Sequence, residues 1–495
     1  MGLFSTKSVA VVLSESESGK HQLKRTLGAG NLIALGIGAV IGAGLFSLTG
    51  LAAAQNAGPA VTISMVIAAI GCALAGLCYS EFSCMIPVAG SAYTYAYTTL
   101  GEWIAWIIGW DLVLEYAVGA STVSISWSAY VVSLFHTFGI TLPAQLCAGP
   151  FEPVKLPDGR MVQGVCNLPA VLVVLLISML LMVGIEESAR TNAVIVAVKI
   201  AVVLVFVGMG WAFIDRANYT PYLPANTGEF GHFGWSGVMA GAGTIFFAYI
   251  GFDAVSTAAQ EARNPQKDMP IGIIGSLAIC TVLYVLFAIV LTGMVPFTKL
   301  GVAAPVAVAV DQTPYTWMNT LVKLGIVMGF TSVILVLLLG QSRVFYSMSR
   351  DGLVPSVFSE IHPRFQTPWR SNLLFFFFVA PFSAFLPLSI VGHMTSIGTL
   401  FAFVLVCAGV WVMRVKNPNA ARPFRTPWVP VVPILGMVWN LGMMYALGWS
   451  NWLRLGVWLV IGQVIYFSYG RHRSRLRVKD AGRPARELTA EASSS

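Results

Sequence analysis

The stretch GIGAVIGAGLF, residues 36–46, places four glycines inside an apolar run long enough to cross a membrane. Glycine in a helix interior costs about 1 kcal/mol relative to alanine. A membrane helix also normally satisfies its backbone N–H and C=O groups within itself. Repeated glycine at the centre of a span therefore predicts a break in that helix, and the rest of the chain should contain a reason for the break.

The composition is that of a membrane protein. Hydrophobic residues make up 57% of the 495 residues and charged residues only 10%, with a mean hydropathy of +0.77, which is too little charge to solvate a soluble surface of that size. A span needs about 20 mostly apolar residues, and the chain contains about 12 such windows. They begin near Asn31, Ala60, Trp103, Leu168, Asn192, Ser236, Ile271, Trp317, Ser371, Met394, Pro430 and Trp452. The sequence predicts an all-α membrane protein of about 12 transmembrane helices, with no large soluble domain.

The basic residues predict the orientation. Most of the 29 Lys and Arg residues fall on the side that carries both termini, and Lys199 lies within a span. The positive-inside rule then places both termini in the cytoplasm of a multi-pass protein in the cell membrane. The net charge of +8 reflects this topology, so we do not expect a nucleic-acid partner. The basic cluster RHRSRLRVK, residues 471–479, follows the last span and should face anionic lipid.

Cysteine and histidine patterns point to no metal site. The seven cysteines form no CxxC pair, and the six histidines lack metal-ligand spacing. Cys147 and Cys166 both fall in the long outer loop between the third and fourth spans, where a disulfide and two free thiols remain equally open.

A second break is predicted in the sixth span, where FFAYIGFDAVS, residues 246–256, sets Gly251 near an acidic residue at mid-membrane. The first and sixth spans run in opposite directions, as an inverted-topology repeat requires. The predicted organisation is a cytoplasmic arm (1–27), a first repeat of helices 1–5 (28–214), a second repeat of helices 6–10 (215–414), helices 11–12 (415–470), and a basic, then disordered tail (471–495).

The two breaks suit a zwitterion, because a half-helix exposes N–H groups at one end and carbonyls at the other. We expect the substrate carboxylate to bind N–H groups after the first break and its ammonium to bind carbonyls at both breaks. The expected substrate-binding backbone is that of Ile41, Gly42, Ala43, Gly44, Leu45, Phe247, Ala248 and Ile250. Close helix packing is the alternative role for the glycines; it is favoured for Gly36 and Gly38, and binding for Gly42 and Gly44.

Four charged residues fall deep in the bilayer. Lys199 lies too far into the fifth span to reach the surface easily, Asp111 and Glu115 share one face of the third span, and Asp253 follows the second break. Three acids against one base call for a bound cation or protons, since unpaired charge is costly in lipid. Glu115 and Asp253 are the expected contacts for the substrate or its waters. Asp111 is assigned a structural role, and a fixed ion pair remains the alternative for Lys199.

Several motifs together resemble the amino acid-polyamine-organocation superfamily, and within it the bacterial relatives of the cationic amino acid transporters. The resemblance covers essentially all spans. It rests on GIGAVIGAGLF, AGPAV (57–61), YSEFSCMIPVAGSAYTY (79–95), GEWIAWIIGWDLVLEY (101–116), FFAYIGFDAVSTAAQEARNPQKDMP (246–270), GQSRVFYSMSRDGLVP (340–355) and PFRTPWVPVVP (423–433).

The resemblance implies a LeuT-type fold with alternating access around a midplane site. Proton-coupled members of the family place a lysine at the position of Lys199, with hydroxyls facing it at the positions of Thr331 and Ser332. Many relatives read GSG or GTG where this chain has Gly42-Ala43-Gly44, so one side-chain hydroxyl contact to the substrate carboxylate is missing here.

These observations favour a secondary active transporter over other classes. We expect proton-coupled import of a cationic amino acid (arginine, lysine or ornithine), with small neutral amino acids as further substrates and the proton as coupling ion without another cofactor. An exchanger or a uniporter of the same fold remains open, as does a small membrane subunit as partner. A receptor would need a signalling domain, and an enzyme would need catalytic residues that the sequence does not show.

Overall fold

A computed structural model describes residues 3–7, 27–86, 91–155, 161–184 and 189–476. Most of the predicted N-terminal arm and the tail beyond residue 476 lie outside the described residues. The α-helices are α2 (Ala29–Val40), α3 (Thr49–Ala52), α4 (Val61–Met85), α5 (Ser91–Thr99), α6 (Glu102–Val113), α7 (Gly119–Thr137), α8 (Leu168–Val183), α9 (Ala189–Gly210), α10 (Gly234–Ile245), α11 (Ala254–Thr257), α12 (Pro265–Met294), α13 (Pro305–Val310), α14 (Thr316–Arg350), α15 (Trp369–Phe385), α16 (Leu388–Lys416), α17 (Val431–Ala446), α18 (Trp449–Ile465) and α19 (Arg471–Arg473). Short 3-10 or π segments relevant to the site are η1 (Gly44–Leu48), η2 (Ala53–Ala57), η4 (Leu114–Val118) and η8 (Phe246–Tyr249).

The helices coincide with the predicted spans. Each apolar window of the sequence falls on a helix or on a helix with its broken continuation. Within the described residues, seven helical stretches are long and apolar enough to cross a membrane, and Ala29–Val40, Leu168–Val183 and Val431–Ala446 are shorter apolar helices. The architecture is therefore that of a helical membrane protein that crosses the membrane several times.

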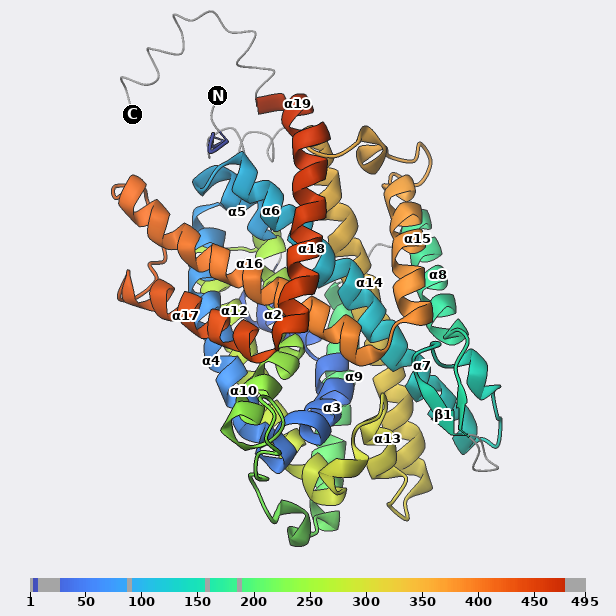
Figure 1. The fold of residues 1–495 in the computed structure, drawn as a ribbon. Coiled ribbons are helices and arrows are strands. Elements are labelled where there is room, and N and C mark those ends of the chain that lie inside the picture. Colours follow the sequence, from blue (N-terminus) through green and yellow to red (C-terminus); the bar gives the residue numbers. More distant parts are fainter. Residues whose placement is uncertain (1–2, 8–26, 87–90, 156–160, 185–188, 477–495) are drawn as a thin grey trace, which may run out of the picture.

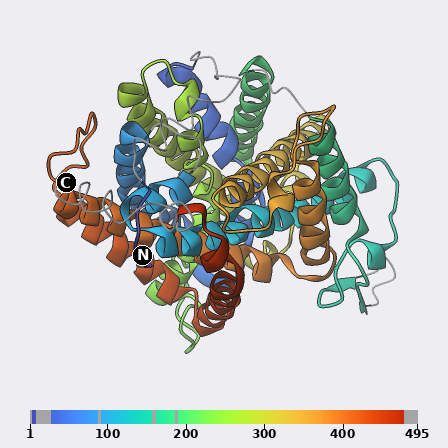
Figure 2. The same cartoon turned by 90° about the horizontal axis from the view of Figure 1, so that it is seen from above.

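One small element departs from the all-α prediction. Strands β1 (Pro153–Lys155) and β2 (Met161–Gln163) pair antiparallel, with Val154 opposite Val162. Three-residue strands are too short for an alternating pattern to show in the sequence. The hairpin belongs to the connection between α7 and α8 and stands at the edge of the bundle (Figures 1 and 2).

Both predicted interruptions are present in the backbone. Helix α2 ends at Val40, Ile41 is extended (φ −72°, ψ 104°), and η1 resumes at Gly44. In the second helix, Ile250 is extended after η8 (φ −59°, ψ 135°). Gly251 has φ +115°, and a Cβ there would lie 2.9 Å from the Ala39 carbonyl, so only glycine fits this turn without strain.

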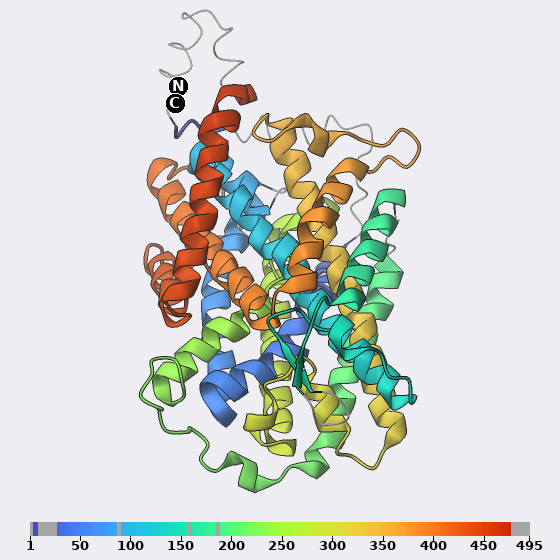
Figure 3. The same cartoon turned by 45° about the vertical axis from the view of Figure 1, so that its right-hand side comes forward.

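The interrupted helices are enclosed by intact ones. Helix α12 packs against α2 and α4, α10 packs against α4, and α14 packs against α7 and α9. Helices α2 and α12 lie inside the bundle in Figure 1, whereas α18 runs along α6 at its side (Figure 3). The rings of Trp110 and Trp458 stack in that contact, with centroids 4.6 Å apart. The breaks are thus shielded from lipid by protein, where irregular backbone is tolerated.

The first and last described segments meet at one end of the bundle. The Lys7 ammonium lies 2.9 Å from the Asp351 carboxylate at the end of α14, and the Arg475 N–H donates to the Asp351 carbonyl at 3.0 Å. Residues 3–7 and α19 therefore share this end (Figure 1), as an even number of membrane crossings would place them.

A buried ion cluster fastens the connection between α16 and α17 to α4. The Glu81 carboxylate, 1% exposed, accepts bonds from Arg414 at 2.8 and 2.9 Å and from the Thr426 N–H at 2.7 Å. Arg422, itself buried, pairs with the same carboxylate at 3.2 Å. Because Glu81 and Arg422 are out of water and the Arg414 side chain is only 22% exposed, removing one partner leaves the others poorly compensated.

We expect Glu81→Gln to destabilise the protein by about 3 kcal/mol, because two arginines then lose their buried counter-charge. The measurement is the apparent unfolding temperature of the purified protein in detergent. Glu360→Gln is the matched control, since Glu360 pairs with Arg370 at the surface, where both side chains are more than 40% exposed. An exposed pair contributes less than about 1 kcal/mol, so equal losses for the two variants would contradict the assignment.

Candidate functional site

The two broken helices meet at Gly44. A Cβ on Gly44 would overlap the backbone of Ala248, so η1 and η8 approach each other as closely as backbone allows. On the other side of the break, a Cβ on Gly42 would lie 3.2 Å from a methyl of Val333 on α14. Gly44 is therefore a packing glycine, as is Gly36, whose Cβ position lies 2.5 Å from the Ser276 hydroxyl oxygen. The binding role of Gly42 and Gly44 stays a prediction.

The backbone groups expected to bind substrate are partly engaged. The Leu45 N–H donates to the Gly42 carbonyl at 3.1 Å, which leaves the predicted carboxylate contacts to the amides of Ala43 and Gly44. The Phe247 carbonyl accepts the Ile250 N–H at 3.2 Å. The carbonyls of Ile41 and Ile250 belong to the extended residues at the two breaks.

Lys199 lies between the first broken helix and α14. The residue is 1% exposed, and its Nζ donates to the Gly38 carbonyl on α2 at 2.5 Å. Its aliphatic stem packs against Gly329 of α14, whose Cβ position is 3.4 Å away. The amine therefore binds the carbonyl end of the half-helix that stops at Val40, one turn from the break.

The two hydroxyls predicted to face Lys199 have partners on their own helix. Thr331 donates to the Val327 carbonyl at 2.8 Å and accepts from the Trp127 indole at 3.0 Å, while Ser332 donates to the Gly329 carbonyl at 2.8 Å. Hydroxyls in apolar helices commonly bond back in this way. Gly329, one turn or less before both hydroxyls, lies against the lysine stem.

Two acids come together from different helices. Glu115 on η4 and Asp253, which precedes α11, lie next to each other and are almost fully buried, at 1% and 0% exposure. The Tyr116 hydroxyl donates to one Asp253 oxygen at 3.1 Å. In the described part of the chain, no ion pair neutralises either carboxylate. The arrangement can hold a cationic group or a proton between the two acids.

Asp111, the third buried acid, packs against α16. It is 1% exposed, and one carboxylate oxygen lies 3.2 Å from the Cβ position of Gly398 on α16. Among the described residues, neither of its oxygens has a hydrogen-bond donor. No backbone N–H group of the described residues donates to the Asp111 carboxylate, although a structural role would use such hydrogen bonds.

Three buried polar residues were not singled out from the sequence, and two of them lie at the broken helices. The Tyr284 hydroxyl on α12 lies 2.8 Å from the Val40 carbonyl and 3.0 Å from the Ala248 carbonyl. The Tyr130 hydroxyl donates to the Phe46 carbonyl at 2.5 Å. A lone tyrosine inside an apolar span is the signal that could have marked both, because a buried hydroxyl needs a partner.

The third is Lys323, which the sequence did not mark as a buried charge. The structure places it in the second turn of α14, 1% exposed, with its amine 2.7 Å from Asp311 and 3.1 Å from the Thr137 hydroxyl. Lys199 is therefore not the only lysine buried in a long apolar helix.

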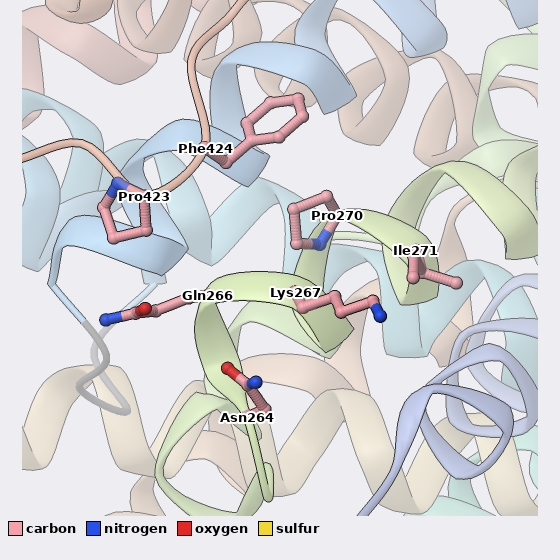
Figure 4. Close-up of a pocket in the computed structure, with 7 residues that line it drawn as sticks. All are labelled: Asn264, Gln266, Lys267, Pro270, Ile271, Pro423 and Phe424. Carbon is pink, nitrogen blue, oxygen red and sulfur yellow. The ribbon is translucent and has the colours of Figure 1, made fainter.

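Features outside the breaks are simpler. Cys147 and Cys166 are both free thiols. Within the described residues, no group of three or more His, Cys, Asp or Glu side chains could hold a metal ion. An open surface pocket of about 490 Å³ lies between the first turns of α12 and the α16–α17 connection (Figure 4). It is lined by Asn264, Gln266, Lys267, Pro270, Ile271, Pro423 and Phe424, none of which belongs to the breaks.

Broken, protein-shielded helices with buried charges define a membrane carrier rather than an enzyme. The chain belongs to the amino acid permease family, whose description "Amino acid permease" it matches over residues 27–466. This confirms the resemblance to the amino acid-polyamine-organocation superfamily.

Three relatives show the breadth of the family. The chain is 44% identical to the methylthioribose transporter of Bacillus subtilis over 474 residues, covering 96% of this chain and 99% of the relative. It is 44% identical to a branched-chain amino acid permease of the same bacterium over 475 residues, with the same coverage. It is 36% identical to the vacuolar cationic amino acid transporter 4 of Arabidopsis thaliana over 418 residues, covering 84% of this chain and 68% of the relative. These relatives are transporters and permeases, not enzymes.

We expect Gly44→Ala to abolish amino acid binding, because a methyl group would force η1 and η8 apart. The measurement is equilibrium binding of radiolabelled amino acids to the purified protein. Gly208→Ala on α9 is the control, since nothing lies within 4 Å of the Cβ position there. Normal binding by the Gly44 variant would show that the two breaks need not touch.

Proposed function

We propose that this protein is a secondary active transporter that imports a cationic amino acid together with a proton. The observation that carries the proposal is the bond from Lys199 to the Gly38 carbonyl, which puts a titratable amine on the half-helix that ends at the first break. The proposed frame is a LeuT-type fold of about 12 spans. Its inverted repeats are residues 28–214 and 215–414, and both termini are cytoplasmic in the cell membrane.

The breaks supply the groups that a zwitterion needs. The amides of Ala43 and Gly44 would bind the carboxylate, while the carbonyls of Ile41, Ala248 and Ile250 would bind the ammonium. Binding would hold η1 and η8 together, because the two ends of one substrate engage both segments. Alternating access would follow from the movement of these segments against the intact helices around them.

The acid pair favours a cationic side chain. Glu115 and Asp253 offer two buried carboxylates side by side. A guanidinium or ammonium group of the substrate would supply their positive counter-charge. Relatives named for branched-chain amino acids and methylthioribose make a neutral substrate the second candidate. In that case the same two acids would share a proton instead.

Proton coupling would act through Lys199. A charged amine binds a carbonyl more strongly than a neutral one, so protonation would hold the end of α2 in place and deprotonation would loosen it. The proton is then the coupling ion, and we propose no other cofactor. Exchange or uniport by the same fold would not need this titration, and a small membrane subunit remains compatible with the exposed helix faces.

We expect Lys199→Ala to bind substrate but to lose accumulation driven by a pH gradient, because the α2 carbonyl no longer has a titratable partner. The measurement is uptake of labelled arginine, alanine, leucine and methylthioribose into proteoliposomes at several pH gradients and a fixed membrane potential. Lys323→Ala is the matched control, since it also removes a buried lysine of a long apolar helix but leaves the breaks untouched. Uptake that ignores pH in the wild type would identify a uniporter or exchanger.

We expect Glu115→Gln to weaken arginine binding by about tenfold or more, or at least about 1.4 kcal/mol, because the amide keeps the shape but loses the charge. Binding of alanine should change by less than about threefold, since its side chain does not reach the acids. Competition binding measures both. Equal losses for arginine and alanine would remove Glu115 from the side-chain site.

A further inference from the structure

Tyr284 connects the two broken helices through one hydroxyl group. The residue lies in the middle of α12 and is fully buried. Its oxygen is 2.8 Å from the carbonyl of Val40, the last residue of α2, and 3.0 Å from the carbonyl of Ala248 in η8. A phenol has a single O–H, so it donates to only one of the two carbonyls at a time.

Both carbonyls belong to irregular backbone at the breaks. The last carbonyls of a helix have no partner within that helix, and a buried carbonyl without a donor is costly, most of all at membrane depth. One hydroxyl between two such acceptors must therefore leave one of them for another donor. The substrate ammonium, which carries three N–H groups, is a donor that arrives and departs during transport.

We propose that the Tyr284 hydroxyl takes the place of the substrate ammonium in the empty carrier. Without substrate it donates to the Ala248 carbonyl and joins η8 to α12. When the ammonium binds that carbonyl, the hydroxyl turns to Val40 and satisfies the end of α2 instead. Tyr284 is thus a positioning residue that stabilises the substrate-free state, and the inference rests on the ammonium site of the proposed function.

The consequence separates two modes of transport. Net uptake requires the empty carrier to return across its cycle, whereas exchange of internal for external substrate uses only loaded carriers. Tyr284→Phe removes the hydroxyl and keeps the ring, whose centroid lies 5.3 Å from that of Tyr249. We expect this variant to lower the ratio of net uptake to exchange by about tenfold, while substrate binding stays measurable.

Tyr249→Phe is the matched control. Tyr249 is an equally buried neighbour, but its hydroxyl donates to the Met65 carbonyl on α4 at 3.1 Å and not to a carbonyl at a break. The experiment measures net uptake and counterflow of the same labelled amino acid in proteoliposomes for the wild type and both variants. A fall of the ratio in Tyr284→Phe alone supports the proposal.

Other outcomes overturn it. An unchanged ratio in Tyr284→Phe, or an equal loss of uptake and exchange, means that the hydroxyl does not act on the empty carrier. An equal fall of the ratio in both variants assigns the effect to packing of the tyrosine pair. If the wild type shows neither uptake nor exchange of any amino acid, the proposed function itself fails, which distinguishes the two failures.

Discussion

The structure depends on the direct backbone contact between η1 and η8 at Gly44 and Ala248. At membrane depth, backbone N–H and C=O groups outside a regular helix are tolerated only where protein surrounds them and supplies hydrogen-bond partners. Here α4, α12 and α14 provide the enclosure, and a few side chains provide the partners. Lys199, Tyr284 and Tyr130 each bond to a carbonyl of the first broken helix or its continuation.

The charges in the bundle follow the same constraint in two different ways. Glu81 is surrounded by two arginines and a backbone N–H, so its cluster is complete and holds helices together. Glu115 and Asp253 have no such cations among the described residues, although they are as deeply buried. Complete networks rigidify a structure, whereas incomplete ones mark places where a ligand or proton completes them.

Much of this could be read from the chain. Hydropathy located the helices, because crossing a bilayer imposes a length and composition on every span. The glycines of residues 36–44 located the first interruption, and Gly251 near an acidic residue located the second, because glycine and charge are both costly at the centre of an ordinary span. The short β1–β2 pair escaped prediction because three residues carry no pattern. The burial of Lys323 was not predicted, because hydropathy cannot detect its ion pair with Asp311.

By itself, the sequence determined that this is a multi-pass helical membrane protein of the amino acid permease family, with two interrupted helices and four candidate charges at depth. Only the tertiary structure decided which groups meet: Lys199 with Gly38, Glu115 with Asp253, and Tyr284 with both breaks. The physical reason is that periodicity and hydropathy are local properties of a helix. Contacts between helices far apart in the chain depend on how their surfaces pack, and no single helix contains that information.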